Sequence, residues 1–363
     1  MTSRALILSG SFGKGHDTVA EACAAALSHR GVECRVLDSV ALLGKRRARL
    51  SHVVFRRMLS LTPLYDAFHF SALRTGSRLA DRADGAALRN SYPRFLAEVD
   101  SFAPDLVLSV FATGAAAGAR LARERRGAKT AVFMTDSFAH RLWVHEGTDV
   151  FLVTSALAAA SVRRFRPDAT VRTVTAPARP AFYDAPSQAA AREALGRPAT
   201  GPCVLLMSGG WGIGPLDLAA RALAASGVGV LAVAGGNERL YRRLLASAST
   251  DSRITAFGFT DRIPELMAAS DLVVTSSGDT CREARVVGRP IVLLDVVPGH
   301  GRENLMHELE LGGAALASSD PDRLVGVVRR VLADPPHVPA ERARAWEGEF
   351  FDALAAAGFA PPS

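Results

Sequence analysis

Cysteine is scarce in this chain, and apolar runs long enough to cross a membrane are missing from it. The four cysteines among 363 residues lie far apart and form no C-x-x-C pair, so we expect neither disulfides nor a thiolate metal site. Uncharged stretches such as 106–119 fall short of the ~20 apolar residues that a spanning helix needs. The first apolar run, at 5–8, is too short for a signal-peptide core. The sequence thus predicts a globular cytoplasmic protein without a bound metal.

Negative charge is also scarce in the first half of the chain. Residues 1–184 hold 26 Lys and Arg against 16 Asp and Glu, a net charge of +10, whereas the remainder holds 17 against 20. Within the first half, residues 44–94 combine eleven basic side chains with frequent Leu, Val and Phe. This mixture is typical of a surface that binds an anionic membrane, and equally of amphipathic core helices with solvated arginines. No recognition motif accompanies the basic residues, so nucleic acid is not an expected partner.

Short β-rich apolar runs alternate with helical patterns along the chain, which is typical of parallel sheets covered by helices. Helical patterns include 18–30, 92–102 and 340–357. The expected strands are 5–8, 34–37, 106–110, 130–134, 150–153, 171–174, 204–207, 228–233, 254–256, 272–275, 291–294 and 314–316. The pattern therefore predicts an α/β protein.

Five prolines between residues 177 and 202 mark a boundary between two similar halves. We expect domains over 1–176 and 177–339, followed by a final helix within 340–363 that returns towards the first domain. Both domains are predicted to be doubly wound and Rossmann-like. We expect them to face each other across a cleft, because ligands bind beyond the carboxyl ends of parallel strands.

Three glycine-containing loops lie between a predicted strand and a predicted helix. The loop at 9–16 spaces its glycines as G-x-x-G-x-G, which matches neither the dinucleotide fingerprint nor the P-loop. The others are 208–215 and 276–284. Backbone N–H groups at such turns can bind phosphate, and a carboxylate one turn into a helix, here Glu283, can accept ribose hydroxyls. Tight structural turns, or an NAD site that uses Asp38, are alternatives from the loops alone.

Five blocks of residues occur in an order that resembles glycosyltransferases of the GT-B fold. The family includes plant monogalactosyldiacylglycerol synthase and bacterial processive diacylglycerol glucosyltransferase, and more distantly the N-acetylglucosaminyltransferase that forms lipid II. The matching residues are Gly15 and His16, then Thr135, Asp136, His140, Trp143 and Asp149, then Gly209 to Pro215, then Gly235 or Gly236 with Asn237 and Leu240, and finally Gly278, Thr280, Glu283, Ala284, Pro298, Gly299 and Asn304.

The resemblance implies an inverting transferase that moves a sugar from a nucleotide sugar, expected to be UDP-linked, to a hydroxyl of a lipid or lipid-linked acceptor. No cofactor and no obligatory metal are implied. The first domain would bind the acceptor and the second the nucleotide sugar. His16 is the expected base, since histidine titrates closest to neutral pH, with Asp136 orienting it or serving instead. The expected acceptor residues are Gly13, Gly15, His140 and Trp143. The expected donor residues are Gly209, Gly210, Gly212, Asn237, Phe259, Gly278, Thr280, Glu283, His300 and Asn304.

Two departures from the family pattern concern the donor. The Gln-Glu pair that contacts the donor sugar in the family is His300-Gly301 here, which leaves the sugar open. Asp279 replaces a glycine and would bring negative charge to the diphosphate unless it meets Arg282 or Arg302. The alternatives are therefore a soluble specialised-metabolite acceptor, a nucleotide-sugar epimerase or a non-catalytic nucleotide-sugar binder. The basic segment 44–94 adds the expectation of a peripheral location on the inner face of the cell membrane.

Overall fold

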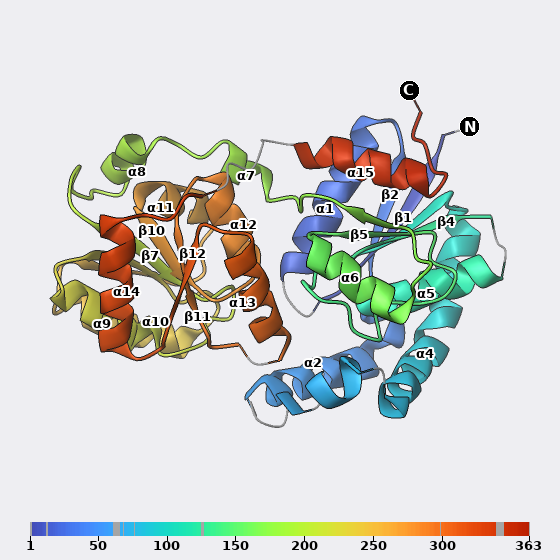
Figure 1. The fold of residues 1–363 in the computed structure, drawn as a ribbon, viewed down its shortest axis with the longest axis horizontal. Helices are drawn as coiled ribbons and strands as arrows, with labels where there is room; N and C mark the ends of the chain where they lie inside the picture. The colour runs from blue at the N-terminus through green and yellow to red at the C-terminus, as the bar shows by residue number, and fades with distance from the viewer. Residues whose placement is uncertain are drawn as a thin grey trace. The chain divides into compact units, whose positions relative to one another are not determined.

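The computed structural model describes residues 2–11, 14–60, 66–67, 69–75, 77–124, 127–297, 299–338 and 345–362. The chain divides into two compact units (Figure 1). Unit 1 comprises Met1–Pro177 together with Arg344–Ser363, and unit 2 comprises Ala178–Ala343. The sequence places its domain boundaries at 176/177 and 339/340, and the acceptor and donor roles of the two domains stay predictions.

Unit 1 is built on a parallel six-stranded sheet with the order β2-β1-β3-β4-β5-β6. Its strands are β1 (Arg4–Ser9), β2 (Glu33–Asp38), β3 (Leu106–Ser109), β4 (Lys129–Phe133), β5 (Val150–Val153) and β6 (Val171–Thr173). Its α-helices are α1 (Lys14–His29), α2 (Lys45–Ser60), α4 (Arg78–Phe102), α5 (Ala112–Arg123), α6 (Ala156–Phe165) and α15 (Ala345–Ala356). A 3₁₀ turn, η1 (Ala41–Leu43), and a π-helical segment, η2 (His69–Leu73), lie between β2 and α4.

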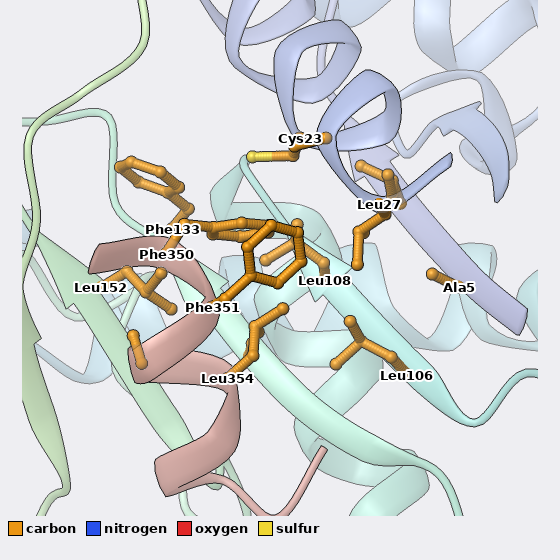
Figure 2. Close-up of a cluster of buried hydrophobic side chains, with 14 of the residues drawn as sticks. Ala5, Cys23, Leu27, Leu106, Leu108, Phe133, Leu152, Phe350, Phe351 and Leu354 are labelled. Carbon is orange, nitrogen blue, oxygen red and sulfur yellow. The ribbon is translucent and has the colours of Figure 1, made fainter. Parts of the chain in front are cut away.

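Alternate residues of the unit 1 strands pack on opposite faces of the sheet, as the two-residue period of a strand requires. Ile7 belongs to a core that α1 and α15 cover, whereas Leu6 belongs to a core that α4 and α5 cover. Figure 2 shows the first of these cores, where Phe350 and Leu354 of α15 gather with residues of α1 and the strands. A helix from the far end of the sequence thus completes the core of unit 1.

Unit 2 repeats the parallel arrangement with the strand order β12-β11-β10-β7-β8-β9. Its strands are β7 (Cys203–Met207), β8 (Gly229–Val233), β9 (Ile254–Phe257), β10 (Leu272–Thr275), β11 (Ile291–Leu294) and β12 (Ala314–Ala317). Its helices are α7 (Pro180–Tyr183), α8 (Gln188–Ala194), α9 (Leu216–Ala225), α10 (Glu238–Ala248), α11 (Ile263–Ala269), α12 (Asp279–Val286), α13 (His300–Glu310) and α14 (Pro321–Ala333). Helices α9, α10 and α14 cover one face of the sheet, and α11, α12 and α13 cover the other (Figure 1).

The predicted α/β class with two doubly wound, Rossmann-like domains is confirmed, and every expected strand is present to within one residue at each end. The start of the first helix is predicted wrongly. The sequence predicts that this helix begins near Asp17 or Thr18. In the structure Asp17 instead accepts a hydrogen bond from Ser9 Oγ at 2.6 Å, and α1 begins at Lys14. His16 therefore lies in the first turn of the helix.

Candidate functional site

Each sheet reverses its winding direction at one strand, and open α/β sheets bind ligands at such a point, beyond the carboxyl ends of their strands. In unit 1 the chain runs from β1 to β2 on one side and then returns to β3 on the other side of β1. In unit 2 the same reversal occurs between β7 and its neighbours β8 and β10. The loops that follow these strands carry most of the residues that the sequence singles out.

His16 is held at the switch point of unit 1 by two oxygen atoms. Its Nδ1 lies 3.2 Å from the carbonyl oxygen of Val110, which follows β3, and 2.9 Å from the Thr135 hydroxyl, which follows β4. The ring also packs edge-on against Phe111, with 4.8 Å between the centroids. A carbonyl can only accept a hydrogen bond, so the Val110 contact requires a proton on Nδ1, and the neutral ring then has its lone pair on Nε2. An imidazole in this state can take a proton from a substrate hydroxyl.

The predicted residues Asp136, His140 and Trp143 form a second cluster beside β4. The indole Nε1 of Trp143 donates to Asp136 Oδ2 at 2.7 Å, and His140 Nε2 lies 3.4 Å from the same oxygen. Trp143 and His140 are both buried. Thr135, whose hydroxyl contacts His16, belongs to the same sequence motif, but the sequence analysis assigns it no role.

The loop after β7 is locked by backbone contacts with the loop after β8. Gly212 has a φ of +55°, and a Cβ at this position would lie 2.2 Å from the carbonyl oxygen of Ala234. The Asn237 side chain donates to the Gly212 carbonyl at 3.0 Å. It also accepts a hydrogen bond from the Leu240 N–H, so Asn237 caps the start of α10. The conformation of this loop therefore depends on glycine at 212 and on both ends of the Asn237 amide.

Gly209 and Gly210 lie at the other side of the same loop. Gly209 has a φ of +56°, and no heavy atom lies within 4 Å of a Cβ built at either glycine. The Gly210 carbonyl accepts a hydrogen bond from the Gly236 N–H at 2.8 Å, which fixes the loop from behind. Open space beside glycine backbone allows close approach of a phosphate group.

The loop after β10 brings a buried carboxylate to the same edge of unit 2. Gly278 precedes α12, Thr280 is buried in the first turn, and Glu283, only 5% exposed, follows one turn later. Burial raises the pKa of Glu283 to about 7, although Arg179 opposes the rise by donating from Nε to Oε1 at 2.9 Å. Arg179 was not predicted, because 104 residues separate it from Glu283 and no local pattern marks it.

The structure also describes several other residues that the sequence singles out, whereas some lie outside the described residues. Asp279 pairs with Arg282 at 2.5 Å, so its charge is compensated as the sequence argument requires. Phe259, which follows β9, exposes 74% of its surface, and Asn304 lies half-buried on α13. Gly15 lies in the first turn of α1, whereas Gly13, Pro298 and the His300 side chain lie outside the described residues. Across the described ranges, no group of three or more His, Cys, Asp or Glu could hold a metal, and no helix is long and apolar enough to span a bilayer.

Comparison with known proteins supports the resemblance in sequence and in fold. Residues 16–170 match the family model described as monogalactosyldiacylglycerol (MGDG) synthase. A probable chloroplastic MGDG synthase of Nicotiana tabacum is 29% identical over 271 residues, which cover 70% of this chain and 50% of the relative. A processive diacylglycerol beta-glucosyltransferase of Bacillus subtilis is 27% identical over 241 residues, 65% of this chain and 63% of the relative. The chain is thus similar in sequence to these lipid glycosyltransferases. It spans about half the length of the plant relatives that it matches.

Solved structures extend the fold likeness to the whole chain. MurG of Acinetobacter baumannii superposes with a TM-score of 0.57 at 14% identity, covering 99% of this chain and 96% of MurG. A UDP-N-acetylglucosamine 2-epimerase superposes with a TM-score of 0.58, also at 14% identity, covering 100% and 99%. The present chain therefore has the GT-B fold. Transferases and an epimerase share that fold, so the choice between the two reactions depends on the site.

Replacing Gly212 with alanine should destabilise unit 2, and Gly210→Ala is the matched control. Alanine at 212 would adopt a left-handed conformation and meet the Ala234 carbonyl, so we expect a loss of more than about 2 kcal/mol in the free energy of unfolding. Alanine at 210 has free space and should change this free energy by less than about 0.5 kcal/mol. Urea unfolding followed by circular dichroism measures both. Equal stability of the two variants would contradict the close approach of the two loops.

Proposed function

We propose that the chain is an inverting glycosyltransferase that moves a sugar from a UDP-sugar to a hydroxyl of a lipid acceptor. The observation that carries the proposal is the position of the His16 ring, whose Nδ1 lies within hydrogen-bond distance of the Val110 carbonyl and the Thr135 hydroxyl, so that in the neutral ring Nε2 would carry the lone pair. This ring lies at the switch point of unit 1, where open α/β sheets bind ligands. It also lies within the segment that matches the MGDG synthase model.

In the proposed reaction His16 acts as general base. As the acceptor oxygen attacks the anomeric carbon, Nε2 takes the hydroxyl proton, and the bond from that carbon to the diphosphate breaks to release UDP. The attack from the opposite side inverts the anomeric configuration. The Asp136, His140 and Trp143 cluster lies on the loop after β4, where it would shape the acceptor pocket.

Unit 2 would bind the nucleotide part of the donor. The loop at Gly209 and Gly210 and the turn at Gly278, which directly precedes α12, would offer backbone N–H groups to a leaving diphosphate. Glu283 would accept the ribose hydroxyls, and Phe259 offers an exposed ring to the base. With these donors in place the transfer needs no obligatory metal. Structural neighbours of this fold include a protein solved with UDP and with UDP-glucose, which supports a UDP-linked donor.

An acceptor panel tests the reaction directly. We expect the protein to release UDP from a UDP-sugar only in the presence of diacylglycerol vesicles, with a new glycolipid detected by mass spectrometry. Glycoside formation confined to soluble alcohols would favour the specialised-metabolite acceptor. Isomerisation at sugar C2 without any acceptor would identify an epimerase, and tight UDP-sugar binding without turnover would identify a binding protein.

Paired substitutions separate the roles of the two units. His16→Ala should lower kcat about 10²- to 10⁴-fold with little change in UDP affinity, because it removes a group that acts only in the transition state. Glu283→Ala should weaken UDP binding by about 1.5–3 kcal/mol, because a charge-assisted contact is lost. Steady-state kinetics and calorimetry measure both effects. A near-normal kcat for His16→Ala would contradict the assignment of His16 as the base. An inactive Asp136→Asn enzyme, together with only a modest loss in His16→Ala, would assign the base to Asp136.

The lipid part of the proposal rests on the exposed face of α2. Leu50, Val53 and Val54 are 62%, 54% and 47% exposed and, at helical spacing, share a face with Arg46 and Arg57. The apolar side chains of a core helix would be covered by other parts of the protein. The exposure of Leu50, Val53 and Val54 therefore argues against a core-helix role for this face of α2. Apolar groups flanked by arginines are suited to the interface of an anionic membrane. We therefore include a peripheral position on such a membrane in the proposal.

Replacing both Arg46 and Arg57 with glutamine should weaken binding to anionic vesicles, because two positive charges are removed. At about 1 kcal/mol for each basic residue near the surface, the double variant should bind roughly 30-fold more weakly. Arg221→Gln with Arg239→Gln, two exposed arginines of unit 2, removes the same charge elsewhere and should leave binding unchanged. Vesicle sedimentation at low salt measures the affinity. Absence of wild-type sedimentation would remove the membrane from the proposal.

A further inference from the structure

Unit 2 contains a cavity at the amino edge of its sheet, opposite the edge that carries the glycine loops. Pro202, Asp271 and Pro290 line it, and these residues directly precede β7, β10 and β11. The cavity has a volume of about 970 Å³. This volume lies at the upper end of the range found for small-molecule sites. Neither the proposed donor site nor the proposed base uses this region.

Three arginines line the cavity, and two of them are already paired. Arg192 donates to Asp271 Oδ2 at 2.9 Å and to the carbonyls of Ala199 and Ala269. Arg285 donates to Glu308 Oε2 at 2.5 Å and to two backbone carbonyls. These two guanidinium groups are therefore neutralised by one carboxylate each.

Arg289 is the third arginine, and it carries the excess positive charge. Its Nη2 donates to the Ala268 carbonyl at 2.8 Å. Within the described part of the chain, no carboxylate lies at ion-pair distance from the Arg289 guanidinium. Burial lowers the pKa of Arg289 and Arg192 adds to this effect, whereas Asp271 opposes it. A half-buried cation without a direct counter-charge favours an anionic ligand.

The arginines also retain unused donor capacity. Arg285 is only 4% exposed, and its Nε is buried without a hydrogen-bond partner, as is the Nε of Arg289. Buried polar groups in native proteins are normally paired, so unpartnered donors beside a cavity indicate a place for an acceptor oxygen. Small adjustments of the guanidinium groups would bring these donors to an oxyanion.

The rest of the wall is aliphatic. Its apolar lining includes Pro202, Val287, Pro290, Leu332 and Val338, and among the described residues that line the cavity none is aromatic. A nucleobase is usually held by stacking on an aromatic ring, so this wall favours a saturated hydrocarbon over a nucleotide. We propose that the cavity binds an amphiphilic anion, with a carboxylate or phosphate head on Arg289 and an alkyl body against the aliphatic wall. This proposal does not depend on the glycosyltransferase assignment.

Calorimetric titration with alkyl anions below their micellar concentrations tests the proposal. Decyl phosphate should bind at least tenfold more tightly than octyl phosphate, because two more methylenes leave water. Comparison of decyl phosphate with decanoate distinguishes a phosphate head from a carboxylate head, and tight binding of either supports the site. Inorganic phosphate binding as tightly as decyl phosphate, equal binding of uncharged decyl maltoside, or saturation by none of these probes would overturn it.

Two pairs of variants locate the ligand. Arg289→Gln should weaken decyl phosphate binding at least tenfold, and Arg221→Gln, at an exposed arginine of the same unit, should not. Because loss of Arg289 could disturb folding, Val338→Glu provides an independent test in a segment outside the helices. It places a negative charge at the cavity and should also weaken binding at least tenfold, whereas Val338→Gln should not. Unchanged affinity in both Arg289→Gln and Val338→Glu would overturn the site.

Discussion

The pairing of β1 with strands on both of its sides determines where the candidate base lies. Because β2 and β3 flank β1, the loop after β1 leads to α1 on one face of the sheet and the loop after β3 leads to α5 on the other. The Val110 carbonyl and Thr135 hydroxyl then face one nitrogen of His16. The chemistry proposed for this ring follows from backbone topology more than from any charged neighbour.

Unit 2 uses the same edge of its sheet for a different purpose. Its loops offer glycine backbone and helix starts, and its acidic groups at that edge are compensated: Asp279 by Arg282 and Glu283 by Arg179. Because Glu283 is buried with a raised pKa, a ligand with neutral hydroxyls suits it better than one that brings further negative charge to it. This arrangement is consistent with ribose at Glu283 and diphosphate at the glycine loops.

The strands could be predicted because each is a short, nearly continuous apolar run, as expected where both faces of a parallel sheet are covered. The Asp279–Arg282 pair could also be anticipated, since residues three apart on a helix are neighbours. The start of α1 could not, because Asp17 has the chemistry of a cap and binds Ser9 instead. Contacts between distant segments, such as Arg179 with Glu283 and Thr135 with His16, leave no local pattern in the sequence.

Helix α15 gives unit 1 a core made from two separate parts of the chain. Phe350 and Leu354 belong to the same buried cluster as Ala5 and Ile7, although the whole of unit 2 lies between them in the sequence. During synthesis, chains are extended from the amino end, and domains fold as their residues emerge. The first sheet must therefore wait with one face covered by α1 but not by α15 until residues 345–359 leave the ribosome, by which time unit 2 has all of its strands and can fold first. A partly uncovered apolar sheet face during this interval is a target for chaperones, so we expect the amino-terminal part of the nascent chain to depend on them more than unit 2 does.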